Sequence, residues 1–422
     1  MAGGMNYSLN LQIGQGAYGN VYRASEVRSG RFVALKRVGF DKCIPESIHF
    51  MAREIKILRR LDHPNIVKLE GLVLSRFSRS LYLVFEYMEH DLARLLSRPN
   101  IKFNESQIKC LMQQLFLGLD HCHSRGVIHR DIKGSNLLVD GNGVLKVADF
   151  GLATFINPRQ RRPLTNHVVT LWYRPPELLL GSTDYGNTVD LWSVGCVFAE
   201  MIFGEPIFQG RTEVEQLYEI FRLCGSPSDE YWRTCKLPWA AIFKSQQPYE
   251  HRLTQTFKFL PQRNLNLLNM LLSVDPTRRG TARAALASEY FLTKPYACDP
   301  SSISNTEEDF KHHEMERRYG HEQYKNACKH EKRWESTWIV MYDYERRIGA
   351  GKAHGYGSFS GFQEMDEDQN LAAPLRGTST ATNLHIKALL QQNSQEVTFY
   401  NDVVVPLYEL TETWMVGNDK DW

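Results

Sequence analysis

The sequence predicts an α+β fold with a small antiparallel β-sheet lobe that carries one helix, a larger and mainly helical lobe, and a C-terminal extension. Residues 7–88 hold short runs rich in β-branched and aromatic residues, which are typical of strands. Residues 89–291 instead carry apolar residues at helical spacing, which indicates amphipathic or buried helices. We therefore expect lobes over 7–88 and 89–291, followed by an extension over 292–422 that is partly disordered.

In the first lobe, the helix is expected over 45–61, where apolar residues recur at helical spacing after Pro45, a residue suited to a first helical turn. The strand-like runs of this lobe are Leu9–Ile13, Val21–Ala24, Arg31–Arg37, Val67–Leu74 and Leu81–Tyr87.

In the second lobe, residues 108–119 form an amphipathic stripe and Asp190–Phe203 reads as a mostly apolar helix. Short strands are expected between the helices, at Val127–Ile128, Leu137–Val139 and Leu145–Ala148.

Composition and charge exclude several classes of protein. The chain is 42% hydrophobic and 23% charged, with a net charge of +2, which is ordinary for a globular protein and gives no global field to hold nucleic acid or an anionic membrane. The basic cluster at 159–162 is the only feature that favours nucleic acid, so we expect no direct nucleic-acid partner. The eight cysteines form no CxxC pair, which indicates reduced intracellular thiols.

Membrane and export signals are also not expected. Residues 1–10 have neither the basic nor the apolar region of a signal peptide. The longest apolar stretch, Val194–Phe203, is too short to cross a bilayer. We therefore expect a nuclear or cytoplasmic protein with no membrane partner.

A glycine-rich motif runs from Ile13 to Val21, with Gly14, Gly16 and Gly19 in the GxGxxG pattern. Glycines allow a hairpin to approach phosphates closely, so that backbone N–H groups reach the oxygens. The pattern alone is weak, because dinucleotide-binding folds and plain turns also carry it. Here a strand rather than a helix follows it.

The next strand carries Ala34 and ends at Lys36. A lysine ending an apolar strand usually extends to solvent, and a lone glutamate such as Glu54 usually lies on a solvated helix face. After the glycine loop, Lys36 becomes a candidate for pairing the α- and β-phosphates of a nucleotide. Glu54 would then face inward and hold this lysine on the phosphates.

The strongest local signal is the run His129-Arg130-Asp131-Ile132-Lys133-Gly134-Ser135-Asn136, followed by Asp149-Phe150-Gly151 and then by Trp172-Tyr173-Arg174-Pro175-Pro176-Glu177. Phosphoryl transfer depends mainly on positioning and charge neutralisation. Asp131 would orient a substrate hydroxyl and accept its proton, and Lys133 would reach the transferring phosphate. Asp149 and Asn136 would hold magnesium. Each acidic residue alone is more often a helix cap or a surface group, but the ordered set indicates a phosphoryl-transfer site.

On these motifs, residues 7–291 resemble a eukaryotic protein kinase domain with its bilobal fold. Three segments are similar to cyclin-dependent kinases: 45–55 to the cyclin-docking helix, 165–174 to the activation segment, and 210–217 with 225–227 to the C-lobe insert. The residues of the activation segment are most similar to the transcription-associated branch, which comprises the RNA polymerase II C-terminal-domain kinases. The 45–55 helix resembles the plant relatives of that branch.

The resemblance implies an enzyme that uses ATP and Mg2+ and transfers the γ-phosphate to serine or threonine followed by proline. It implies a cyclin partner docked on the 45–61 helix, the polymerase repeats as substrate, and the nucleus as the favoured location. Two alternatives stay open: a cell-cycle-type cyclin-dependent kinase, and a catalytically weak partner-binding scaffold. Intact Lys36, Glu54, Asp131, Asn136 and Asp149 argue against the scaffold.

The resemblance also assigns nucleotide contacts. Phe85 falls at the gatekeeper position, Glu86 and Met88 would bind adenine through their backbones, and Asp91 would lie at the ribose end.

For regulation, Thr165 matches an activating phosphothreonine, made by a separate activating kinase and received by Arg53 and Arg130. The third arginine of the animal pattern is replaced by Thr154, so the phosphate is expected to order the loop less strongly unless Arg159, Arg161 or Arg162 substitutes. Tyr18 is a possible inhibitory phosphosite, because a phosphate there would place like charge beside the nucleotide.

In the substrate region, Val168, Val169 and Arg174 match residues that shape a pocket for proline. Thr170 together with Lys133 matches the serine/threonine pattern. Structural roles are implied for a Glu177–Arg279 pair and for Asp190, which would brace the catalytic loop.

From about Ser301 the resemblance ends, and no function is assigned to the extension. Residues 307–333 are dense in charge, and their histidines with Cys328 match no zinc template. Gly349–Gly361 resembles linker material, and Val397–Val405 is strand-like and stops at Pro406.

Overall fold

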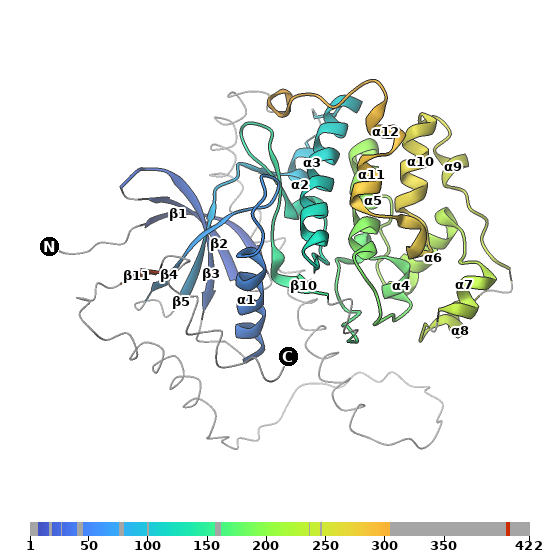
Figure 1. Ribbon diagram of the computed structural model, residues 1–422, viewed down its shortest axis with the longest axis horizontal. Helices are drawn as coiled ribbons and strands as arrows, with labels where there is room; N and C mark the ends of the chain where they lie inside the picture. The colour runs from blue at the N-terminus through green and yellow to red at the C-terminus, as the bar shows by residue number, and fades with distance from the viewer. Residues whose placement is uncertain are drawn as a thin grey trace, which may run out of the picture. The chain divides into compact units, whose positions relative to one another are not determined.

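A computed structural model describes residues 7–16, 19–26, 28–39, 45–75, 80–98, 101–156, 162–235, 237–244, 247–303 and 402–405. It confirms the predicted fold class. Figure 1 shows a β-sheet with helix α1 beside it, followed along the chain by a lobe built mainly of helices.

The sheet of the first lobe is antiparallel throughout, in the order β1-β2-β3-β5-β4-β11. Its strands are β1 Tyr7–Gly16, β2 Gly19–Glu26, β3 Phe32–Gly39, β4 Leu69–Ser75, β5 Ser80–Glu86 and β11 Asp402–Val405. The last of these lies within the strand-like run at 397–405 and pairs with the outer edge of β4.

Helix α1, Pro45–Leu58, begins at the predicted proline and ends three residues before the predicted end at Leu61. The strand predicted from Val67 also begins late, at Leu69. Its first residues are instead held by the second lobe, where the Val67 N–H donates to the Val147 carbonyl at 2.9 Å. A Cβ on Gly118 would lie 2.7 Å from the Asn65 carbonyl oxygen, so a glycine is needed at this close approach.

The second lobe is built mainly of helices. They are α2 Leu92–Leu96, α3 Glu105–Ser124, α4 Pro176–Leu179, α5 Thr188–Phe203, α6 Glu213–Cys224, α7 Asp229–Thr234, α8 Ala240–Phe243, α9 Leu253–Thr256, α10 Gln262–Leu271, α11 Ala282–Leu286 and α12 Glu289–Leu292.

Short strands and 3-10 turns precede, separate and follow these helices. The strands are β6 His90–Asp91, β7 Val127–Ile128, β8 Leu137–Val139, β9 Leu145–Val147 and β10 Thr154–Phe155. The turns are η1 Gly134–Asn136, η2 Phe150–Leu152, η3 Leu171–Tyr173, η4 Pro276–Arg279 and η5 Pro300–Ser302.

Local sequence explains the two long helices. Asn104 and Gln107 form a capping box at the start of α3, which satisfies backbone donors that a helix start leaves free. Helix α5 is buried along nearly its whole length and ends at Gly204, which has a φ of +84°, a conformation that favours glycine. Within the described part of the chain, no helix is both long and apolar enough to span a membrane.

The described chain continues past residue 291 and packs on α3. The Lys109 Nζ donates to the Thr293 carbonyl at 2.8 Å, and the Gln107 side chain donates to the Ser302 carbonyl at 3.0 Å. The start of the extension therefore packs with the helical lobe. The predictions for 307–333 and 349–361 lie outside the described residues.

A buried ion pair joins the end of the activation segment to the core, as expected. The Arg279 guanidinium donates to both Glu177 carboxylate oxygens, at 2.6 and 2.7 Å, and lies over the Trp192 ring. Both side chains are buried. Removing one partner would leave the other charge buried and uncompensated.

We predict that Glu177→Gln lowers the free energy of unfolding by about 3–5 kcal/mol, because the Arg279 charge stays buried. Chemical denaturation measures the change. Asp120→Asn is the matched control: it breaks an ion pair with Arg283, whose side chain is 79% exposed, and should cost less than about 1 kcal/mol. Equal losses in the two variants would contradict the prediction.

Candidate active site

Three charged side chains from both lobes meet between β3, α1 and η2. The Lys36 Nζ lies 2.8 Å from Glu54 Oε1 and 2.9 Å from Asp149 Oδ1. Burial disfavours the lysine charge, but the two carboxylates outweigh burial and raise the pKa of Lys36. The predicted Lys36–Glu54 contact is present, and Lys36 is held charged at the base of the site.

The glycine-rich motif forms the hairpin between β1 and β2, in which Gly14 lies opposite Val21 and Gly16 opposite Gly19. At Gly19, φ is +151° and a Cβ would lie 1.8 Å from the Arg37 carbonyl oxygen. Only glycine fits there. The hairpin tip with Tyr18 lies outside the described residues, so the inhibitory phosphosite stays a prediction.

The remaining predicted nucleotide contacts lie on strands of the sheet and on the connection to the second lobe. Ile13 is in β1 and Val21 in β2, while Ala34 in β3 lies opposite Phe85, the predicted gatekeeper, in β5. Met88 follows β5 and is buried.

Two acidic residues near this connection already have partners. The Glu86 carboxylate accepts the Lys68 N–H at 2.8 Å and pairs with Lys146 at 3.0 Å, so its side chain is engaged, and the contact of its backbone with adenine stays a prediction. Asp91 caps α2 through the Arg94 N–H, which a ribose hydroxyl would have to share.

Asp131 is the centre of a hydrogen-bond network. Its Oδ1 accepts from the Thr170 hydroxyl at 2.7 Å, and its Oδ2 accepts from the Asn136 amide at 2.9 Å. The Lys133 Nζ lies 3.0 Å from Asp131 Oδ2 and 2.9 Å from the Thr170 hydroxyl. The network fixes the direction of the carboxylate and places Lys133 beside it.

The predicted magnesium ligands lie on adjoining chain segments. The Ala148 N–H donates to the Asn136 carbonyl at 2.9 Å, which brings Asp149 next to Asn136. Because the Asn136 amide nitrogen bonds Asp131, its side-chain oxygen is left for another partner. An amide oxygen and a carboxylate are the hard donors that Mg2+ prefers, so these residues fit that ion.

Asp190 of α5 holds the catalytic loop in place, as expected. Its carboxylate accepts the backbone N–H groups of His129 and Arg130 at 2.9 and 2.8 Å. His123 Nε2 lies 2.9 Å from the same carboxylate. Arg130 has a φ of +67°, an uncommon conformation for a non-glycine residue, and this bracing holds it.

At the activation segment, Thr165 is exposed, and the hydrogen bonds found in the described part of the chain link Arg130 to it through Tyr185. The Arg130 Nη1 donates to the Tyr185 hydroxyl at 3.1 Å, and that hydroxyl donates to the Thr165 carbonyl. Thr154 is engaged in β10, opposite Ile128. Arg159 and Arg161 lie outside the described residues.

The predicted proline pocket is built on a strained residue. Val169 has a φ of +68°, and its carbonyl accepts from the Arg174 Nε at 3.0 Å. The other end of that guanidinium pairs with Glu213 at the start of α6. Val168 beside it is buried.

Two residues that contact the site, Tyr185 and Glu213, are not predicted from the sequence. Tyr185 belongs to no motif, and Glu213 lies in the insert at 210–217, which indicates only the family. Outside the site, Asn65 joins α3 to β9, because its amide donates to Gln114 and to the Leu145 carbonyl. Such contacts have no fixed spacing in the sequence.

Comparison with known proteins agrees with this geometry. The family described as "Protein kinase domain" matches residues 7–291. Cyclin-dependent kinase C-2 C of Arabidopsis thaliana is 61% identical over 311 residues, which are 73% of this chain and 48% of the relative. A probable serine/threonine-protein kinase of the same plant is 61% identical over 292 residues, 69% of this chain and 51% of the relative. The chain thus spans about half the length of these relatives.

A solved structure is also similar. The crystal structure of the yeast RNA Pol II CTD kinase CTDK-1 complex has a chain that is 37% identical, with a TM-score of 0.65, covering 71% of this chain and 97% of that one. The chain described here belongs to the protein kinase family, and the resemblance read from its motifs is confirmed.

We predict that Thr170→Val, which removes the hydroxyl bonded to Asp131 but keeps the side-chain volume, lowers kcat for peptide phosphorylation by roughly 10- to 100-fold. Thr170→Ser keeps the hydroxyl and should remain within about 3-fold of the parent. Steady-state kinetics at saturating ATP measures both. A valine variant as active as the serine variant would show that this hydrogen bond does not position Asp131.

Proposed function

We propose that this chain is a cyclin-dependent serine/threonine kinase that transfers the γ-phosphate of Mg-ATP to serine or threonine followed by proline. The observation that carries the proposal is the Asp131 network beside the Val169–Arg174 contact. It joins a phosphoryl-transfer site to a surface selective for the next residue of the substrate.

The residues divide the chemistry among themselves. Asp131 orients the substrate hydroxyl and accepts its proton, and Lys133 neutralises charge on the phosphate as it moves. Lys36, held by Glu54, binds the nucleotide phosphates under the glycine hairpin. A magnesium ion held by Asp149 and Asn136 would neutralise phosphate charge.

The proposed selection of proline follows from the Val169 carbonyl, which already accepts a hydrogen bond within the protein. The Val169 carbonyl accepts from Arg174, so it offers no acceptor to the N–H of the residue after the target hydroxyl. An N–H buried without a partner is costly, and proline has none. The pocket therefore favours Ser-Pro and Thr-Pro.

The cyclin and the polymerase substrate are supported by the relatives. Several are named cyclin-dependent kinase C, and the similar solved structure is titled as an RNA Pol II CTD kinase complex. Helix α1, which carries Glu54 to Lys36, is the proposed docking surface for a cyclin, because shifting it would move Glu54. The same relatives favour the nucleus as the location.

We predict that the chain, purified with its cyclin, phosphorylates a peptide of Ser-Pro heptad repeats. Asp131→Asn should lower kcat by roughly 100-fold or more, the range lost with a general base. Radiolabelled phosphate transfer and mass spectrometry of the product measure the reaction.

Failure of the parent complex to transfer phosphate would exclude the enzyme. In that case Mg-ATP affinity by calorimetry would test the alternative of a partner-binding scaffold. Identification of the copurifying cyclin separates the transcription-associated kinase from a cell-cycle kinase acting on other Ser-Pro proteins.

Thr165 is proposed as the activating phosphosite, received by Arg53 and Arg130. A phosphate there adds close to two negative charges that can pair with arginine. Because Thr154 stands where a third arginine would reach this site, the gain on phosphorylation should be modest.

We predict that Thr154→Arg raises the ratio of kcat/KM between Thr165-phosphorylated and unphosphorylated enzyme by roughly 10-fold, the effect of one added charge-assisted hydrogen bond. Thr154→Gln, which adds length without charge, is the control and should leave the ratio unchanged. An equal ratio in the two variants would show that residue 154 does not reach the phosphate.

A further inference from the structure

We infer that Glu213, the first residue of α6, is a positioning residue for proline selection and acts through Arg174. The inference rests on the proposed function, because it concerns the same substrate surface. Glu213 pairs with the Arg174 Nη1, while the Arg174 Nε holds the Val169 carbonyl.

The ion pair is needed because Arg174 is buried. Its side chain is 4% exposed, whereas that of Glu213 is 46% exposed. Burial lowers the pKa of Arg174, and the carboxylate of Glu213 counteracts this effect. A buried guanidinium without its carboxylate would turn toward water.

The planarity of the guanidinium links its two contacts. Because its nitrogens lie in one rigid fork, fixing Nη1 on Glu213 also fixes the direction in which Nε points at Val169. Loss of Glu213 would therefore weaken the bond to the Val169 carbonyl, although Glu213 itself does not contact Val169 through any hydrogen bond that the described residues show.

Val169 is the residue whose backbone would change if Arg174 released its carbonyl. A β-branched residue at a φ of +68° is strained and stays so only while its surroundings hold it. Once Arg174 releases the carbonyl, the peptide group can turn and offer an acceptor to the substrate. If the substrate residue after the target hydroxyl carries an N–H, that N–H would then have an acceptor. Its cost as an unpaired buried donor would disappear, and proline would lose its advantage.

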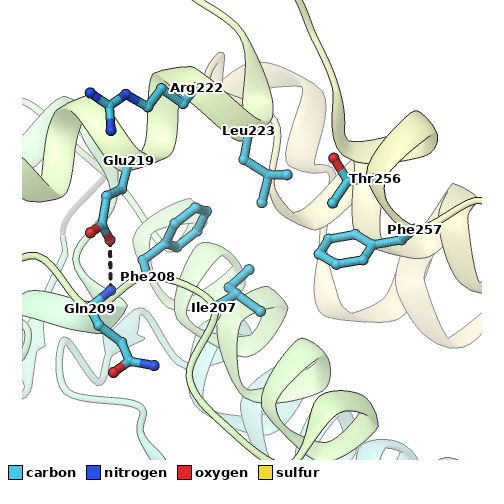
Figure 2. A pocket seen from close by; sticks show the side chains of 8 residues that line it. All are labelled: Ile207, Phe208, Gln209, Glu219, Arg222, Leu223, Thr256 and Phe257. Carbon is cyan, nitrogen blue, oxygen red and sulfur yellow. Dashed lines mark hydrogen bonds between the residues drawn. The ribbon is translucent and has the colours of Figure 1, made fainter.

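Hydrogen bonds fix the start of α6, where Glu213 lies. Gly210 donates its N–H to the Gln216 side chain and accepts from the Trp172 ring nitrogen. Figure 2 shows the bond from the Gln209 N–H to the Glu219 carboxylate, which ties the segment before α6 to the helix. The carboxylate of Glu213 is thus presented from a fixed helix end that already contacts the activation segment.

The test compares Glu213→Gln with Glu215→Gln. Both remove one negative charge from the first turn of α6, but the Glu215 carboxylate accepts the Arg211 N–H at 3.0 Å, so Glu215 serves as the matched control. The full chain with its cyclin is assayed on matched peptides with Ser-Pro, Ser-Ala and Ser-(N-methylalanine), and melting temperatures check folding.

The preference for Ser-Pro over Ser-Ala in kcat/KM should fall by roughly 10-fold or more in Glu213→Gln and stay within about 2-fold in Glu215→Gln. Glu213→Asp, which keeps the charge, should retain part of the preference. The N-methylalanine peptide has no N–H, so the variant should gain activity on Ser-Ala and not on this peptide.

An unchanged preference in Glu213→Gln, or an equal loss on all three peptides, would overturn the inference while leaving proline selection standing. A parent enzyme that does not prefer Ser-Pro would overturn the proposed proline selection, and the role of Glu213 with it.

Discussion

The buried carboxylate of Asp190 holds the catalytic loop in its conformation. Its side chain is 1% exposed, and a buried carboxylate is costly unless several donors satisfy it. Two backbone N–H groups of the loop and His123 supply those donors. The arrangement fixes the unusual backbone at Arg130, and so sets where Asp131 stands. The catalytic loop is thus positioned from α5, a helix that is buried along nearly its whole length, and not by the loop's own sequence alone.

The activation segment is held at both ends by a carboxylate paired with a buried basic side chain. It begins at Asp149, which pairs with Lys36, and closes at Glu177, which pairs with the fully buried Arg279. Between these ends, Thr170 is bonded to Asp131. Each pair joins residues far apart in the chain, so the segment keeps this conformation only when the sheet lobe and the helical lobe are both in place.

The elements and site residues that could be predicted from the sequence either follow a local pattern or need a partner of opposite charge. Helix α5 followed from its apolar composition and the strands from runs of β-branched and aromatic residues. Lys36 needed a carboxylate partner, which the next helix supplies as Glu54. The late start of β4 could not be predicted, because Val67 reads as strand and its partner Val147 lies in the other lobe. The contacts of Tyr185 and Glu213 depend on how α6 and the loop before α5 pack, which no local pattern encodes.

The two halves of the activation segment are held with different strength. Near Thr165 the link from Arg130 ends in a hydrogen bond between the neutral Tyr185 hydroxyl and the Thr165 backbone carbonyl, and hydrogen bonds between neutral groups stabilise less than charge-assisted ones. Near Val169 the link is a buried arginine paired with a carboxylate. The backbone at Val169 is therefore held by the fold itself, whereas order around Thr165 has most to gain from an added charge. A phosphate there would strengthen the weaker half without altering the half that is proposed to select the substrate.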